Sequence, residues 1–123
     1  MTDFNTEYQK LNEKQHHAVD TIDGPVMVIA GAGTGKTQTI ALRIANILTK
    51  TQTNPSSILC LTFTDTGVNA MRSRLIKIIG STAYSVRLHT FHSFCNEIIL
   101  SHPENFIISH DLQPADELEK LEI

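Results

Sequence analysis

The 123-residue sequence has little of what defines several classes of protein. Two cysteines, Cys60 and Cys95, are too few for a disulfide framework or a zinc cluster. With four prolines, six glycines and 41% hydrophobic residues, the chain is unlike disordered or collagen-like proteins. It has no apolar run near the roughly 18 to 20 residues of a membrane span, and no secretory signal pattern. We therefore expect one compact globular domain, cytoplasmic and without a membrane partner.

The sequence also lacks an excess of positive charge. Ten basic residues stand against 13 acidic ones, a net charge of −3. Residues 111–123 hold five of the acids and one lysine, so the rest of the chain carries nine basic and eight acidic residues. A near-neutral body of this kind neither requires nor excludes a nucleic-acid partner.

The spacing of apolar residues predicts one helix followed by three strand-helix units. Asn12 and Gln15 have the spacing of a capping box for the first helix, which should end near residues 24–25. The strands are expected at residues 26–30, buried on both faces, at 58–63 and at 85–89. Helices of this length between strands imply parallel neighbours. The predicted fold class is α/β, a truncated P-loop NTPase-type parallel sheet with flanking helices.

Break signals place the ends of the other helices. The helix after residue 35 should stop near residues 54–55, the next at Gly80, and the one capped by Thr90 near residues 102–103. A brief extended piece at 106–108 and a helix at 114–121 are expected beyond that point. Three strands leave one sheet edge uncovered, so we expect the chain to be a piece of a larger protein.

The segment AGAGTGKT at residues 30–37 lies between a predicted strand and a predicted helix, as a phosphate-binding loop must. Its three glycines let backbone N–H groups point at phosphate oxygens, and the helix N-terminus adds positive potential. Lys36 would reach the β- and γ-phosphates, and the Thr37 hydroxyl would ligate Mg²⁺. The alternative is a glycine-rich turn with a solvated lysine. A dinucleotide fingerprint is disfavoured, because its third glycine would have to be Lys36.

Four blocks occur in order along the chain: LNEKQHHAV at 11–19, the glycine loop at 30–37, TFTDTGVNAMRSR at 62–74 and HTFHSFC at 89–95. Together they resemble the Q motif, Walker A motif, motif Ia and motif Ib of UvrD/Rep-type superfamily 1 DNA helicases. The resemblance covers the first part of the family's N-terminal motor domain, called 1A.

The resemblance implies a set of nucleotide-binding residues. Gln15 would read adenine, because a side-chain amide can donate and accept together at the N6/N7 edge. By itself, that glutamine also fits a polar residue on an exposed helix face. Lys36 and Thr37 would be catalytic, with ATP and Mg²⁺ as cofactors. The implied ATP-binding residues are Gln15, Ala30, Gly31, Ala32, Gly33, Thr34, Gly35, Lys36, Thr37 and Gln38.

The resemblance also implies contacts with DNA. Phe63 would offer a face on which a base stacks, although core packing at a strand end explains its pattern equally well. Motif Ia departs from the family pattern: Asp65 replaces asparagine and Thr66 replaces lysine, which weakens attraction for phosphates. The implied DNA-binding residues are Phe63, Thr64, Asp65, Arg74, Thr90 and His92.

The fourth block leaves two local alternatives. His89, His92 and Cys95 could hold a metal ion, but a fourth ligand is lacking. Cys95 with His92 could be a catalytic pair, but no third group is evident to orient the histidine.

A helicase of this family also needs an acidic motif at the end of an apolar strand, which orients the attacking water. The pair Asp116-Glu117 follows Pro114 and is typical of a solvated helix face instead. We therefore expect residues 1–110 to be a partial 1A domain, and residues 111–123 to be an acidic segment that starts a missing continuation.

The resemblance implies that the parent protein is an ATP-dependent helicase. It would translocate on single-stranded DNA and unwind duplex DNA, 3′-to-5′, whereas this fragment should lack hydrolysis. The alternatives are a stand-alone P-loop nucleotide-binding module without DNA activity, or a scaffold with an inactive loop.

Overall fold

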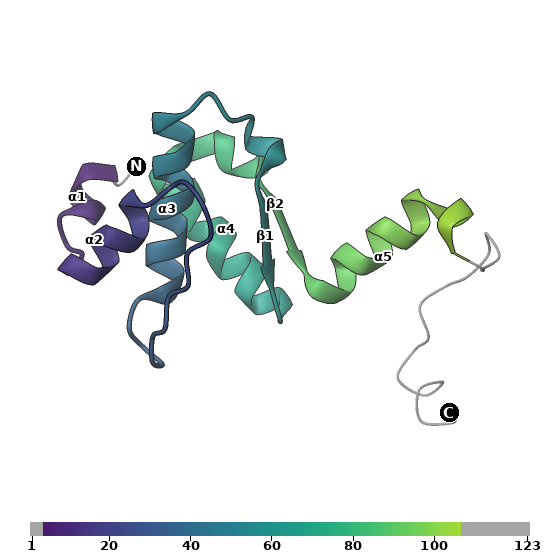
Figure 1. Cartoon of the computed structure of the whole chain (residues 1–123), viewed down its shortest axis with the longest axis horizontal. Helices are drawn as coiled ribbons and strands as arrows, with labels where there is room; N and C mark the ends of the chain where they lie inside the picture. Colours follow the sequence, from purple (N-terminus) through teal and green to yellow (C-terminus); the bar gives the residue numbers. More distant parts are fainter. Residues whose placement is uncertain (1–3, 107–123) are drawn as a thin grey trace. The chain divides into compact units, whose positions relative to one another are not determined.

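The structure is a computed structural model that describes residues 4–106 (Figure 1). It divides into a first unit that ends at Phe91 and a second unit that begins at His92, and each is described by itself. The predicted helix at 114–121 lies outside the described residues. The helices and strands are α1 (Phe4–Tyr8), α2 (Glu13–Asp20), α3 (Lys36–Lys50), β1 (Leu59–Thr62), α4 (Asp65–Ile79), β2 (Arg87–Thr90) and α5 (Phe91–Ser101), with 3₁₀ turns η1 (Pro55–Ser57), η2 (Gly80–Ser85) and η3 (Pro103–Asn105).

The sheet of the first unit consists of two parallel strands, β1 and β2, joined through α4. Their register pairs Leu59 with Arg87 at one end and Thr62 with Thr90 at the other. The carboxyl ends of both strands therefore meet at the same edge of the sheet. The predicted α/β class, a small parallel sheet flanked by helices, is confirmed.

Two predicted caps are present, whereas two helices end earlier than predicted: α2 at Asp20 instead of near residues 24–25, and α3 at Lys50 instead of near residues 54–55. The Asn12 side chain accepts a hydrogen bond from the Gln15 N–H at 3.0 Å, and Gln15 Oε1 accepts from the Asn12 N–H at 2.9 Å, so the capping box of α2 is confirmed. Thr64 caps α4 by accepting from the Gly67 N–H at 3.0 Å. Gly80 forms the predicted C-cap of α4.

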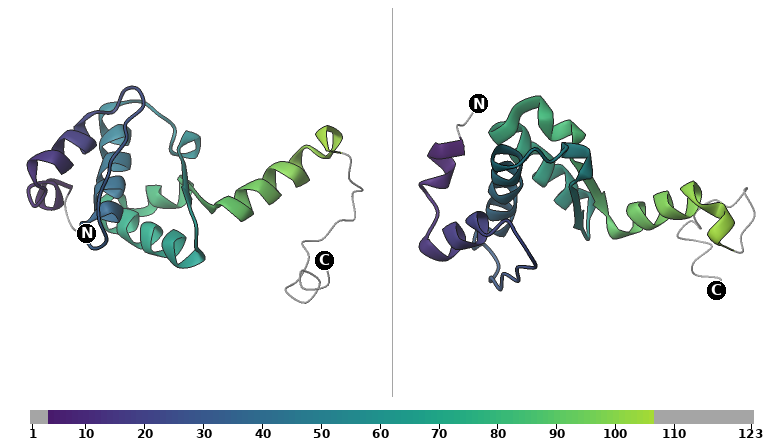
Figure 2. Two further views of the ribbon diagram at one scale, coloured as in Figure 1. Left: turned by 60° about the horizontal axis from the view of Figure 1, so that its bottom comes forward. Right: turned by 45° about the horizontal axis from the view of Figure 1, so that its top comes forward.

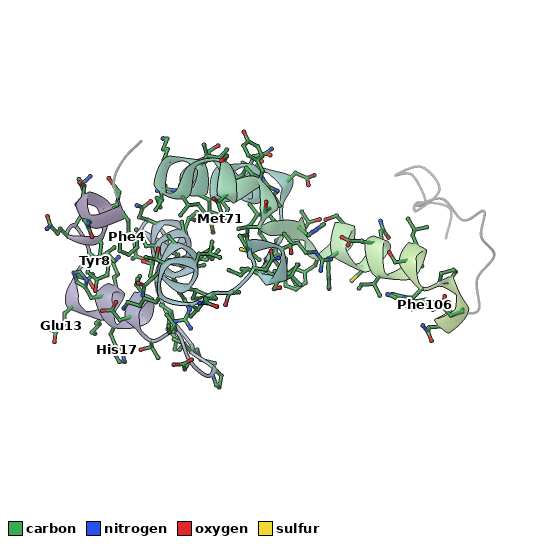
Figure 3. The ribbon with its side chains drawn as sticks, turned by 90° about the horizontal axis from the view of Figure 1, so that it is seen from above. Phe4, Tyr8, Glu13, His17, Met71 and Phe106 are labelled. Carbon is green, nitrogen blue, oxygen red and sulfur yellow. The ribbon has the colours of Figure 1, made fainter. Side chains whose placement is uncertain are left out.

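The core of the first unit lies along α3 and α4. Helix α3 packs against α2 and α4, and α4 packs against both strands (Figures 1 and 3). The predicted stripe of α4 is buried at Met71, Leu75 and Ile78, whereas in α3 the predicted Ile40 is 44% exposed and Ala41, Leu42 and Ala45 are buried instead. Fully buried side chains come from all these layers: Val19 in α2, Leu42 in α3, Leu75 in α4 and Val86 before β2.

Polar side chains fasten these layers to one another. From α3, Arg43 Nη1 donates to the Ala18 carbonyl at 2.6 Å, and Asn46 Nδ2 donates to the Val19 carbonyl at 3.0 Å. Both carbonyls belong to the last turn of α2, where backbone acceptors lack intrahelical partners. These bonds hold α2 against α3 and so position Gln15, at the other end of α2, beside the glycine loop.

The first predicted strand is wrong. Residues 26–30 are extended, but they have no ladder partner within residues 4–106, and Met27 and Ile29 are 87% and 92% exposed. Figures 1 and 2 show this segment running beside α3 and apart from β1 and β2. An apolar run encodes a tendency to be buried, but a strand also needs a neighbour that pairs with its backbone. The described part of the chain supplies none.

The second unit is described from residue 92 to residue 106. Helix α5 ends at Ser101, next to the predicted break at residues 102–103, and η3 follows. The extended piece expected at 106–108 is described only at Phe106, which lies in a bend. Across residues 4–106, no helix has both the length and the apolar character needed to cross a membrane.

Candidate nucleotide-binding site

The glycine loop leads from the extended segment into α3 through two glycines in the left-handed backbone region. Gly33 has φ of 72° and Gly35, the N-cap of α3, has φ of 78°. L side chains rarely adopt this conformation. A Cβ on Gly35 would also stand only 3.3 Å from Gln15 Nε2. Glycine at position 35 therefore allows both the turn and the close approach of Gln15.

The first turn of α3 is open to an external acceptor. Gly35 provides no side-chain cap, and the first turn contains no acidic residue. The leading N–H groups of an α-helix have no partner inside the helix, and the helix dipole places positive potential at that end. An anion such as phosphate is the partner that this combination favours.

Lys36 forms hydrogen bonds with the backbone at the start of the loop. Its Nζ donates to the carbonyls of Ala30 at 3.2 Å and Gly31 at 3.0 Å, while Thr34 Oγ1 donates to the Gly31 carbonyl at 2.6 Å. The ammonium group thus lies over the loop with one further proton to donate. The structure brings Ala30, Gly31, Thr34 and Lys36 together as predicted neighbours.

Gln15 lies against the loop and not on a solvated helix face. Its Nε2 donates to the Thr34 carbonyl at 2.9 Å, and its Oε1 accepts from the Asn12 N–H. The amide keeps one hydrogen and one acceptor lone pair beyond these two bonds. Those are the two groups that recognition of adenine requires.

A cavity of about 300 Å³ adjoins the loop. Two cations, Lys36 and Arg43, line it, and within residues 4–106 no carboxylate does. Arg43 is not among the predicted site residues, although it shares one face of α3 with Lys36 and Ile40, and this helical spacing could have identified it. The residues around the cavity are Gln15, Ala18, Val26, Val28, Ala30, Thr34, Lys36, Thr39, Ile40 and Arg43.

Other predicted nucleotide residues lie around this cavity but do not line it. Ala32 and Gly33 are exposed in the loop, and Thr37 is half-buried in the first turn of α3. Gln38 faces another way: its Nε2 donates to Glu7 Oε2 at 2.9 Å, and its Oε1 accepts from Arg74 Nη1 at 2.7 Å. A predicted ATP-binding residue and a predicted DNA-binding residue therefore contact each other.

The donor set limits what kind of metal site the chain can form. Within residues 4–106 no three His, Cys, Asp or Glu side chains come close enough to hold a metal ion. The Thr37 hydroxyl fits a Mg²⁺ ion held mainly by nucleotide phosphates, the usual situation for this ion.

The predicted DNA-binding residues are spread over three places. Phe63, which directly follows β1, is 86% exposed within the described residues and lies outside the core of the first unit. Thr64 and Asp65 form the N-cap and first residue of α4, whereas Arg74 lies near the other end of that helix, bonded to Gln38. Thr90 is buried at the end of β2. His92 is exposed and belongs to the second unit.

A parallel β-α-β unit, preceded by a glycine loop that opens an uncapped helix, defines the α/β P-loop class. Residues 11–123 match the UvrD/REP helicase N-terminal domain family, and the chain belongs to that family.

Curated relatives agree with this assignment. The chain is 42% identical over 89 residues to "Probable DNA helicase II homolog" of Mycoplasma capricolum and 38% identical over 89 residues to "ATP-dependent DNA helicase PcrA" of Staphylococcus aureus. Each match covers 72% of this chain and 12% of the relative. The Staphylococcus epidermidis PcrA is 36% identical over 96 residues, 78% of this chain and 13% of the relative. The chain therefore spans about an eighth of the length of these relatives and resembles their N-terminal part.

Proposed function

We propose that the chain is the N-terminal ATP-binding portion of an ATP-dependent DNA helicase. One observation carries the proposal: the uncapped first turn of α3 and the Lys36 ammonium both face a loop whose adjoining cavity contains no carboxylate. Positive potential that no neighbouring acid neutralises favours a polyphosphate.

Three side chains divide the recognition of ATP in this proposal. Lys36 binds the β- and γ-phosphates, and Gln15 uses its remaining amide groups for adenine. The Thr37 hydroxyl provides one ligand to Mg²⁺, which neutralises phosphate charge when bound. The hydrogen bond from Gln15 Nε2 to the Thr34 carbonyl supports this division, because it joins the proposed adenine-binding side chain directly to the phosphate loop.

The DNA partner is proposed for the whole protein. The relatives are named as DNA helicases, and Phe63 presents an exposed ring next to the sheet edge. We propose that the parent translocates on single-stranded DNA and unwinds duplex DNA, 3′-to-5′. Stacking on a phenylalanine ring tolerates every base, which suits a translocating motor.

Hydrolysis is expected to be absent from the 123-residue chain. Attack by water on the γ-phosphate needs a group that orients the water and neutralises charge in the transition state. Among the described residues, none that lines the cavity carries a carboxylate. Release of phosphate by the pure chain at a rate above that of Lys36→Ala would contradict this expectation.

Titration of a fluorescent ATP analogue with Mg²⁺, followed by anisotropy, tests the proposal. Hydrogen bonds to charged groups contribute about 1.5 to 3 kcal/mol, so Lys36→Ala should weaken binding by about tenfold or more. Lys50→Ala is the matched control, because Lys50 lies in the last turn of the same helix and forms only an exposed ion pair with Asp20. Equal affinities for all three proteins, each with an intact circular dichroism spectrum, would refute the site.

The stand-alone nucleotide module is the main alternative. It predicts the same response to Lys36→Ala but no binding of single-stranded DNA. Titration of a fluorescein-labelled oligothymidine into the chain therefore separates the two. Saturable binding that is weakened when Phe63 is replaced by alanine supports the helicase portion, whereas no binding by the unsubstituted chain favours the module.

A further inference from the structure

The register of the sheet brings two phenylalanines together. Thr62 and Thr90 are paired residues at the carboxyl ends of β1 and β2. The next residue of each strand is a phenylalanine, Phe63 after β1 and Phe91 after β2. Because the strands are parallel, both rings emerge at the same sheet edge, and their centroids lie 5.2 Å apart with an interplanar angle of 39°.

The two rings are exposed to different degrees. Phe63 is 86% exposed and Phe91 is 44% exposed. A centroid distance of 5.2 Å falls within the range of attractive aromatic pairs, so Phe91 contacts the Phe63 ring and restricts its motion. Most of the Phe63 ring stays accessible. A side chain that already contacts a second ring loses little further conformational entropy when a planar group stacks on it.

The negative charge of Asp65, beside the Phe63 and Phe91 rings, favours a neutral stacking group over a charged one. Asp65, the first residue of α4, is exposed two residues after Phe63. A carboxylate repels a phosphate but has little effect on a neutral, planar base. The site thus offers a base-stacking face and little attraction for the backbone phosphates.

We infer that Phe91 is a positioning residue, which holds the Phe63 ring in the orientation that stacks on a base of single-stranded DNA. This inference rests on the proposed DNA-binding function. Phe91 acts through Phe63, so its contribution should disappear when the Phe63 ring is absent. Stacking of this kind discriminates little among bases, so affinity at this contact should depend on the aromatic pair and not on the DNA sequence.

The test measures binding of the 123-residue chain to fluorescein-labelled oligothymidine at low salt. Phe63→Ala should weaken binding by about fivefold or more, since stacking is worth about 1 to 3 kcal/mol per base. Phe91→Ala should weaken it by about threefold to tenfold, because the Phe63 ring loses its support. The double variant should bind no more weakly than Phe63→Ala within about twofold. Phe91→Tyr keeps the ring and should restore binding, whereas Phe91→Leu keeps only the volume and should not.

Tyr84→Ala is the matched control, because Tyr84 is an exposed aromatic residue in η2, before the other end of β2. It should bind like the unsubstituted chain. Thermal melts check that each variant is folded. If Phe63→Ala weakens binding and Phe91→Ala does not, or if the two effects add, the positioning role is overturned while the proposed function stands. If the unsubstituted chain fails to bind, or Phe63→Ala has no effect, the DNA part of the proposed function fails and this inference fails with it.

Discussion

Gln15 joins α2 to the phosphate loop, because its Nε2 donates to the Thr34 carbonyl at 2.9 Å. The same amide completes the capping box with Asn12, so one side chain both starts a helix and contacts the loop. A family motif residue is thereby part of the local fold as well as of the proposed site. Two protein hydrogen bonds hold the amide beside the loop, which favours a preformed site.

Substitution at the two ends of the capping box separates these roles. Gln15→Ala removes the cap partner and the loop contact, whereas Asn12→Ala removes only the cap. Each should lower the free energy of unfolding by about 1 kcal/mol. Only Gln15→Ala should also weaken binding of the ATP analogue, by about threefold to tenfold, because it removes the proposed adenine contact and the bond to Thr34. Urea unfolding and anisotropy measure the two effects. Equal nucleotide affinities for the two variants would contradict the role of Gln15.

The bond between Arg74 and Gln38 gives a prediction about stability. Arg74→Ala and Gln38→Ala should each reduce the free energy of unfolding by about 0.5 to 1 kcal/mol, and a double-mutant cycle should show that the losses are not additive. Arg74→Lys keeps the charge but loses the arginine's planar fork. If Arg74 contacts DNA phosphates as the resemblance implies, Arg74→Lys should retain oligothymidine binding while Arg74→Ala does not. Additive stability losses would show that the bond is not formed in solution.

The hydrogen bond of Tyr8 predicts that the free energy of unfolding decreases at alkaline pH. Its O–H donates to Asp20 Oδ2 at 2.6 Å, and this hydrogen bond, with burial and the negative charge of Asp20, raises the Tyr8 pKa. A raised folded-state pKa means that the stabilisation is fully present below the ordinary tyrosine value of about 10 and is lost as pH rises through the folded-state pKa. Figure 3 shows Tyr8 with Phe4 on α1, whose ring stacks on it.

Urea unfolding from about pH 8 to about pH 11 checks this prediction. Stability should fall over that range in the unsubstituted chain and fall less steeply in Tyr8→Phe. Tyr84→Phe is the control, because it leaves the Tyr8–Asp20 bond in place. Identical slopes for Tyr8→Phe and the unsubstituted chain would rule out the contribution of this bond.

The two thiols should differ in reactivity. Cys60 lies within β1, and burial raises the pKa of its thiol, whereas Cys95 is exposed on α5. Because the thiolate is the reactive form, Cys95 should react with a disulfide reagent about tenfold faster than Cys60. Cys95→Ser should leave only the slow phase, and urea should abolish the difference. A single fast phase from both thiols in the folded chain would mean that burial in β1 does not protect Cys60 from the reagent.

The phosphate loop and the helix caps could be predicted from sequence because their causes are local. Gly33 and Gly35 adopt positive φ within the loop itself, and the capping box needs only residues three apart. The predicted α2, α4 and α5 and the β1–β2 pair followed from periodicity and from caps in the same way. The predicted strand at 26–30 failed because its pattern encodes apolar surface and not the neighbour that would pair with it.

By itself, then, the sequence determined the parts of the molecule whose energetics depend on neighbours along the chain: the capping box of α2, the glycine C-cap of α4 and the left-handed glycines of the phosphate loop. The tertiary structure alone decided which distant residues meet. It placed Phe63 against Phe91 through the strand register, and Gln38 between Glu7 and Arg74. These contacts arise from the packing of helices and strands far apart in sequence, and no local pattern of residue types specifies such packing.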